Sequence, residues 1–382
     1  MIYFDNAATT YPKPPQVGEM LKASLELYGG NPGRSGHKIS MDTAMMVYNC
    51  REIVSQTFGC EPEDVVFTQN CTMASNFALQ GILEFGDHVL ISDLEHNSTA
   101  RPIYEMYTKG IISYDVVPTF FDDKQTIKSF EKLIKPTTKL ISCTHGSNVF
   151  GTKLPIEGIA RLAKKHGIYM MVDAAQTAGI MDINMKQMGI DFLCTAGHKG
   201  LYGPAGTGLL ITPYGERLET IMQGGTGSNS LELTQPLFMP DRLESGTVNV
   251  PGIAGLYKGI EFVTQKGTEN IYRHEMELTQ YICSRLWNTE NIIMYTPKLT
   301  APSLPVISFN IKGITGEQTA AMLNEKGIAI RGGYQCAFLA HQKMNTIDSG
   351  TARISIGVFN TMQQAEKLCD EIKNLTYSLN KS

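Results

Sequence analysis

The chain has 382 residues, of which 42% are hydrophobic and 18% are charged, and its formal net charge is −4. This composition can bury a sizeable core, which excludes a disordered chain, and the slightly acidic balance excludes a general attraction to nucleic acid or to anionic membranes. We expect no membrane span, because no apolar run approaches ~20 residues, and no secretory signal at the N-terminus.

The eight cysteines include no C-x-x-C pair and no Cys/His cluster at zinc spacing, so the sequence predicts no metal site. A chain of this length needs no disulfide framework. Reduced thiols are therefore expected, which is typical of a cytoplasmic protein.

The first 14 residues, which run into Pro12, Pro14 and Pro15, are expected to form an extended arm that packs on the C-terminal part of the chain. From about residue 50 to 215, apolar runs of strand length alternate with helix-like segments. The strand-like runs cover residues 65–67, 88–91, 111–117, 139–142, 168–172, 192–194 and 208–211, and helices are expected at 72–83 and 156–165. This alternation predicts an α/β fold with a mostly parallel sheet covered on both faces.

After Pro251 the pattern changes to that of an α+β unit. One long helix is expected over residues 255–288, followed by strands at 304–311, 328–331 and 352–356 and by helices at 317–326 and 362–379. We therefore predict an arm over residues 1–14, a large α/β domain over 15–260 and a smaller α+β domain over 261–382, with the boundary inside the long helix.

Three polar groups follow predicted strands of the large sheet, where open α/β sheets bind ligands. Asp173 ends the 168–172 strand, and Lys199 lies in a glycine-flanked turn 26 residues later. Thr72 opens a helix after the 65–67 strand, and helix N-termini bind phosphate readily. Taken singly, these residues also fit a loop carboxylate, a solvated lysine and a plain N-cap.

Taken together, the three groups match what pyridoxal phosphate (PLP) requires. The phosphate needs N–H and hydroxyl donors, the aldehyde needs an amine, and the ring nitrogen needs a carboxylate. A buried Asp173 also needs a positive partner, and Lys199 could be that partner or a nucleophile that forms a Schiff base.

Further motifs extend along nearly the whole chain. They are Tyr3 to Thr10, Asn31 to His37, Leu94 to Asn97, Ser147 to Gly151, Asp173 to Gln176, Gly197 to Lys199, Glu244 to Thr247 and Arg331 to Cys336. On these residues the sequence resembles the class V aminotransferase family, within fold type I of the PLP enzymes, and specifically its cysteine desulfurase and selenocysteine lyase branch.

The resemblance implies a role for each matching residue. Lys199 would hold PLP through its amine and shuttle the Cα proton, and Asp173 would pair with the pyridinium nitrogen. Gln176 would touch the phenolic oxygen. His96 would stack on the ring and help to move protons, and Asn148 would lie near the substrate amine and the phenolic oxygen.

The resemblance also implies that Thr72, the Cys71 backbone and His198 hold the phosphate. Thr247 would reach the phosphate of a partner subunit, so the active site would be shared in a homodimer. A sulfur-acceptor protein of unknown identity is a further implied partner.

In this branch, a loop that begins with Arg and ends in Cys faces the cofactor. Here that loop runs from Arg331 to Cys336, and Arg353 follows it. Arg353 would grip the substrate carboxylate in a bidentate pair, with Arg331 assisting. Cys336 would attack the sulfur of L-cysteine, leaving a persulfide on the enzyme and releasing L-alanine.

Three positions depart from the family pattern. The residue before the cysteine is often His and is here Gln335, and Phe338 replaces a frequent Pro. Thiolate formation must then depend on Arg331, the substrate or the cofactor. The position three before Lys199 usually carries a hydroxyl and is here Ala196, a loss that we expect to weaken PLP binding by ~1 kcal/mol.

The sequence leaves several alternatives open. The same residues could act on selenocysteine. Cys336 could be incidental in a class V aminotransferase, epimerase or β-lyase. The departures also allow a catalytically inactive subunit with a PLP-enzyme fold that serves as a scaffold.

Overall fold

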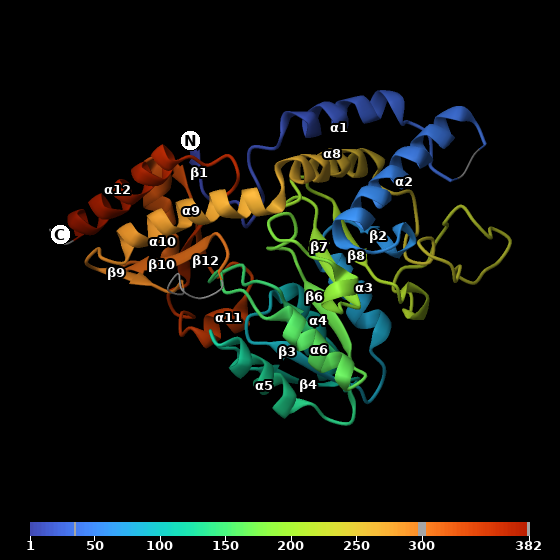
Figure 1. Cartoon of the computed structure of the whole chain (residues 1–382), viewed down its shortest axis with the longest axis horizontal. Coiled ribbons are helices and arrows are strands. Elements are labelled where there is room, and N and C mark those ends of the chain that lie inside the picture. The colour runs from blue at the N-terminus through green and yellow to red at the C-terminus, as the bar shows by residue number, and fades with distance from the viewer. Residues whose placement is uncertain (34–35, 297–302, 380–382) are drawn as a thin grey trace.

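The computed structural model describes residues 1–33, 36–296 and 303–379 (Figure 1). Its main sheet has seven strands in the order β2-β8-β7-β6-β5-β3-β4. The strands are β2 (Val65–Thr68), β3 (His88–Ser92), β4 (Ser113–Val117), β5 (Thr138–Thr144), β6 (Tyr169–Asp173), β7 (Phe192–Ala196) and β8 (Gly208–Ile211). Only β8 runs antiparallel to its neighbours in this sheet, so the predicted mostly parallel α/β class is confirmed.

Helices cover both faces of the main sheet. One face packs against α3 (Cys71–Ile82) and α4 (Asn97–Thr108), and the other against α2 (Lys38–Phe58), α6 (Ile156–Lys165) and α8 (Val250–Lys266). Strand β6 shows why: Met170 and Val172 join one core, whereas Met171 joins the other. Side chains alternate along a strand, so a run that is apolar at every position must be buried on both faces.

A second, antiparallel sheet forms the smaller unit in the order β12-β13-β10-β9. Its elements are α9 (Thr268–Leu286), β9 (Ile292–Met294), β10 (Val306–Ile311), α10 (Gly316–Glu325), β11 (Ile328–Ala329), β12 (Arg331–Gly333), α11 (Phe338–Lys343), β13 (Thr351–Ser355) and α12 (Met362–Leu379). The N-terminal β1 (Ile2–Tyr3) pairs in parallel with β11. The position of the domain boundary near residue 260 stays a prediction.

Two sequence expectations about this region are wrong in detail. The expected helix over 255–288 is two helices, because Gly267 has a φ of 79° and ends α8 before α9 begins. A positive φ is the left-handed conformation that interrupts a right-handed helix. The expected strand over 328–331 is likewise split, because β11 pairs with β1 whereas β12 pairs with β13.

The remaining elements lie at the periphery. They are α1 (Pro15–Leu27), α5 (Asp123–Leu133), α7 (Met185–Met188) and the 3-10 turns η1 (Pro62–Asp64) and η2 (Gly215–Arg217). Across the described ranges, no helix has the length and apolar character needed to cross a membrane. Arg34 and Ser35, which belong to the Asn31 to His37 motif, lie outside the described residues.

Candidate active site

Lys199 lies in a tight turn that follows β7. Gly197 opens this turn, and a Cβ atom at that position would lie only 2.2 Å from Thr207 Oγ1, so the close approach requires glycine. The N-terminal arm covers the turn, because Thr10 Oγ1 donates to the Lys199 carbonyl at 2.9 Å. The backbone that carries Lys199 is therefore fixed from both sides.

The environment of Lys199 favours a neutral amine. Burial lowers its pKa below the ordinary value, and the nearby positive charges of Arg353 and Arg331 act in the same direction. The carboxylate of Asp173 opposes them. A lysine with a lowered pKa has more of the unprotonated form that attacks an aldehyde.

Asp173 is the last residue of β6 and is 4% exposed. Its Oδ1 accepts hydrogen bonds from Ala175 N–H at 2.9 Å and from Cys71 Sγ–H at 3.5 Å. Burial, and then the Asp173 charge, raises the pKa of the Cys71 thiol well above its usual range, so Cys71 stays protonated and donates. This carboxylate is fixed in place beside the Lys199 amine.

Helix α3 begins directly beside this pair. Asn70 caps the helix by accepting from Met73 N–H at 2.9 Å, which leaves the first N–H groups, those of Cys71 and Thr72, at the open end. Such N–H groups and the helix dipole favour a phosphate. The predicted phosphate cradle is thus adjacent to the predicted amine and carboxylate.

His96 is the N-cap of α4 and stays neutral at pH 7. Its Nδ1 accepts from Ser98 N–H at 3.0 Å, so the ring proton lies on Nε2. Burial lowers the pKa of His96 to about 4, and the positive charges of Lys199 and Arg331 add to that effect. The His96 ring lines one cavity together with Thr72.

His198 and Gln176 both contact the N-terminal arm. The His198 carbonyl accepts from Lys13 Nζ at 2.6 Å, and burial, with Lys199 and Lys13, lowers the pKa of its ring to about 4. Gln176 Nε2 donates to the Ala7 carbonyl at 3.1 Å.

The hydroxyl missing at Ala196 is not supplied by its neighbour. Thr195 is fully buried, and its Oγ1 donates to the Ala174 carbonyl at 3.5 Å. The phosphate cradle therefore has one side-chain donor fewer than the family pattern provides.

Arg353 is almost completely buried, at 1% exposure, and has partners within the chain. Its Nη2 lies 2.6 Å from Asp5 Oδ1, and its Nη1 donates to the Asn148 carbonyl at 2.9 Å. Its Nε–H has no hydrogen-bond partner among the described residues. Arg331 pairs with Arg353 in the β12–β13 register, so the two guanidinium-bearing residues lie opposite each other on adjacent strands.

Cys336 lies on the loop between β12 and α11, and it is the only one of the eight cysteines that is exposed. A cavity of about 690 Å³ is lined by Cys336 together with Thr72 and His96. Asn97 N–H donates to the Cys336 carbonyl at 2.8 Å. The thiol therefore opens on the same cavity as predicted cofactor-binding residues.

Thr247 is the predicted site residue that lies apart from this cluster. It is exposed, and its Oγ1 accepts from Asn31 Nδ2 at 3.2 Å. Its expected role toward a partner subunit stays a prediction.

The sequence analysis missed three residues that the structure adds to the site. Asp5 pairs with Arg353, Glu95 is buried directly before His96, and His341 lies behind the Cys336 loop, where it contacts Gln335. Asp5 lies inside the Tyr3 to Thr10 motif and Glu95 inside the Leu94 to Asn97 motif, so their place in those motifs could have marked them as site residues. The Gln335–His341 contact has no comparable signal in the sequence.

The residues present fit PLP. A buried amine with a lowered pKa, a buried carboxylate beside it and an open helix N-terminus are the groups that the aldehyde, the ring nitrogen and the phosphate need. Across residues 1–33, 36–296 and 303–379, no group of three or more His, Cys, Asp or Glu side chains could hold a metal ion.

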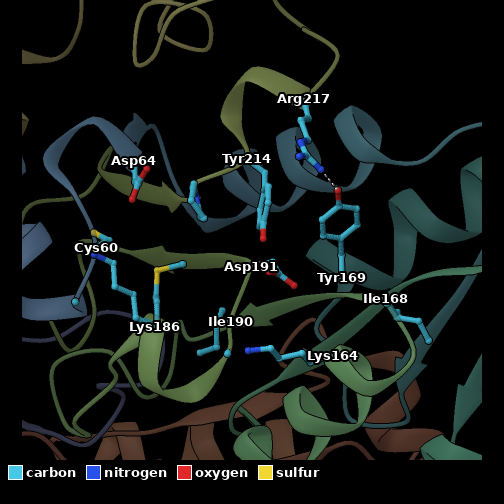
Figure 2. A pocket seen from close by; sticks show the side chains of 15 residues that line it. Cys60, Asp64, Lys164, Ile168, Tyr169, Lys186, Ile190, Asp191, Tyr214 and Arg217 are labelled. Atoms are coloured by element: carbon cyan, nitrogen blue, oxygen red, sulfur yellow. Dashed lines mark hydrogen bonds between the residues drawn. The ribbon is translucent and has the colours of Figure 1, made fainter.

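A second cavity, of about 490 Å³, lies at the opposite, amino-terminal edge of β6 and β7 (Figure 2). Several of its polar groups have protein partners. Asp191 accepts from Met170 N–H at 2.7 Å, and Arg217 donates to the Tyr169 hydroxyl at 2.9 Å. None of the predicted site residues, Lys199 and Asp173 among them, lines this cavity, so it is not the candidate active site.

Comparisons with known proteins agree with this geometry. The family model described as Aminotransferase class-V matches residues 2–368. The chain is 32% identical to the "probable cysteine desulfurase" of Halalkalibacterium halodurans, covering 96% of this chain and 91% of that protein. It is 29% identical to the protein of the same name from Methanothermobacter thermautotrophicus, covering 98% of this chain and 94% of that protein. The apo structure of the cysteine desulfurase from Thermococcus onnurineus superposes with a TM-score of 0.92 at 31% identity, covering 99% of this chain and 95% of that one.

Proposed function

We infer that this chain, which belongs to the class V aminotransferase family, is a PLP-dependent cysteine desulfurase. It converts L-cysteine to L-alanine and retains the sulfur as a persulfide on Cys336. The observation that carries this conclusion is the exposed Cys336 thiol on the cavity lined by Thr72 and His96. A thiol that opens beside predicted phosphate-binding and ring-stacking residues is placed as a nucleophile of this reaction would be.

We propose Arg353 and Arg331 as the residues that bind the substrate. Arg353, with Arg331 beside it, receives the carboxylate, because a buried guanidinium with a free Nε–H gains a charge-assisted hydrogen bond from an incoming anion. Bound PLP supplies an electron sink for the charge that develops at the substrate Cα. Lys199 takes the Cα proton on its Nζ, and His96 holds a transferable proton on Nε2.

Cys336 performs the sulfur transfer as a thiolate. Its sulfur bonds to the substrate sulfur as the substrate Cβ–S bond breaks. The electron pair of the broken bond stays with the three-carbon fragment, which takes up a proton and leaves as alanine. The two thiols thus yield alanine and a persulfide, so atoms and electrons balance without an external oxidant.

The protein acts as a homodimer that shares its active sites, with Thr247 reaching the partner's phosphate. Support comes from large apolar side chains that are exposed on α2 and on the neighbouring 219–247 segment, since exposed apolar surface is what a subunit interface covers. They are Met41, Met45, Tyr48, Leu231, Leu233 and Leu237. In Figure 1 this segment extends outward beside α2.

Sulfur passes from the Cys336 persulfide to an acceptor protein. The exposure of Cys336 supports that step, because an acceptor thiol has to reach the outer sulfur. A cytoplasmic location is part of the same proposal, since all eight cysteines are free and a persulfide cycle needs a reducing compartment.

The test measures alanine formed from L-cysteine, with a reductant present, by the PLP-loaded protein and by Cys336→Ala. The matched control is Cys60→Ala, which removes a partly buried thiol at the cavity of Figure 2. We expect alanine from the wild type and from Cys60→Ala and almost none from Cys336→Ala. No alanine from the PLP-bound wild type would refute the desulfurase assignment, and undiminished alanine from Cys336→Ala would refute the persulfide step.

A further inference from the structure

The loop that carries Cys336 rests on a buried network of side chains. Gln335 is 4% exposed and His341 is fully buried, and Gln335 Oε1 lies 3.1 Å from His341 Nε2. Gln335 Nε2 donates to the Thr351 carbonyl at 3.0 Å. His341 Nδ1 lies 2.7 Å from Thr346 Oγ1. The network joins the loop to β13 on one side and to α11 on the other.

The direction of each hydrogen bond follows from the chemistry of the groups. The Thr351 carbonyl can only accept, so the Gln335 amide nitrogen faces it and Oε1 faces His341. His341 therefore carries its proton on Nε2 and donates it to Gln335, while Nδ1 accepts from the Thr346 hydroxyl. Position 335 thus needs a side chain that ends in both a donor and an acceptor. An ionised Glu has no donor, and Met has neither.

The loop backbone needs this support. Gln335 and Cys336 have φ values of 44° and 56°, so two successive non-glycine residues are left-handed, a conformation that persists only where the surroundings impose it. Both carbonyls are held by the larger unit, because Asn148 Nδ2 donates to Gln335 O at 2.7 Å and Asn97 N–H donates to Cys336 O at 2.8 Å. The Gln335 side chain holds the same two residues from the other side.

We propose that Gln335 and His341 are positioning residues for sulfur transfer, which hold the Cys336 thiol at the cavity in the geometry that attacks the substrate sulfur. The proposal rests on the proposed function and specifies how its nucleophile is placed. Gln335, which departs from the family pattern, would thus contribute by holding the loop in place and not by transferring a proton. Both side chains are buried, and neither lines the cavity on which Cys336 opens.

The main test replaces Gln335 with Met, which has similar length but makes no hydrogen bonds. The matched control is Gln342→Met, at an exposed position of α11. For Gln335→Met we expect kcat for alanine formation from L-cysteine to fall at least tenfold with KM within twofold. Exchange of the α-proton of L-alanine in D2O, which needs Lys199 but not Cys336, stays within twofold.

A second readout does not depend on catalysis. Ala337 N–H donates to the Tyr334 carbonyl at 3.0 Å across the loop, so amide hydrogen exchange of the 333–340 segment reports its order. We expect that exchange to be at least tenfold faster in Gln335→Met than in the wild type or Gln342→Met.

His341 variants provide a rescue test. His341→Gln keeps a donor near the Nε2 position and should keep kcat within threefold, whereas His341→Leu should match Gln335→Met. The proposal would be overturned if Gln335→Met left kcat unchanged or left the amide hydrogen exchange of the 333–340 segment unchanged. It would also be overturned if the variant lost alanine formation and α-proton exchange to the same extent. If the wild type forms no alanine, the proposed function fails, and the exchange measurement alone decides whether Gln335 orders the loop.

Discussion

Replacing Glu95 with Gln tests the charge state of a carboxyl group that lies close to Asp173. Glu95 is fully buried, and its Oε1 accepts from the Ser92 hydroxyl at 2.5 Å and from Thr144 N–H at 2.7 Å. Its Oε2 has no hydrogen-bond partner within the described chain. Burial raises the pKa of Glu95 from 4.5 to about 8, and the Asp173 charge adds to that effect. We therefore expect a neutral Glu95 at pH 7.

Because the pKa of Glu95 is raised in the folded state, this residue makes the free energy of unfolding decrease as pH rises. Between pH 4.5 and pH 8 the folded state holds a proton on Glu95 that the unfolded state has lost. Each pH unit in this window then costs about 1.4 kcal/mol of the free energy of unfolding. The loss is roughly 3 kcal/mol from pH 5.5 to pH 7.5, or about 3 °C in Tm for a chain of this length. In Glu95→Gln the side chain is neutral in both the folded and the unfolded state, so the variant does not lose this stability as pH rises.

The assay is thermal unfolding of the PLP-loaded wild type and Glu95→Gln at both pH values, at fixed protein and PLP concentrations because ligand and subunit binding shift Tm. The Tm of the variant relative to the wild type should rise by about 3 °C between pH 5.5 and pH 7.5. Alanine formation at pH 7 should stay within threefold. An unchanged or reversed Tm difference would refute the neutral carboxyl, and Glu84→Gln, at an exposed position, controls for loss of a surface charge.

Three further changes test other parts of the site. Arg353→Lys should raise KM for L-cysteine at least tenfold in steady-state kinetics, because one ammonium cannot hold both Asp5 and the substrate carboxylate. Asp173→Asn should lower kcat at least a thousandfold while soluble protein is retained, because an amide cannot keep the PLP ring nitrogen protonated. Gly208→Ala should weaken PLP binding at least fivefold in an absorbance titration, because its Cβ would lie 2.4 Å from the Asn70 backbone carbon and displace the start of α3.

The large sheet could be predicted because its signals are local. The run at 168–172 is apolar at every position, which is the pattern of a strand buried on two faces, and helix α6 has the bounds that its sequence predicted. The break at Gly267 could not be predicted, since an isolated glycine is tolerated inside a helical pattern. The pairing of β1 with β11 joins two-residue strands from distant parts of the chain, and no periodicity marks it.

The same distinction between local signals and long-range contacts applies to the candidate site. Lys199 and Asp173 could be found because each follows a strand end of the large sheet, where residue type and spacing carry the signal. The partner of Arg353 could not, because Asp5 is 348 positions away in the chain. Gln335 was noted as a departure, but only the fold shows that its side chain turns inward to His341.

The N-terminal arm belongs to the active site as much as to the fold. Its β1 strand pairs with β11 of the smaller unit, its Asp5 neutralises the buried Arg353, and its Thr10 holds the Lys199 turn of the large sheet. A buried guanidinium without its carboxylate costs several kcal/mol. Any movement of the smaller unit against the large sheet must therefore strain or break the contacts of the arm, which couples the position of Arg353 to that of Lys199.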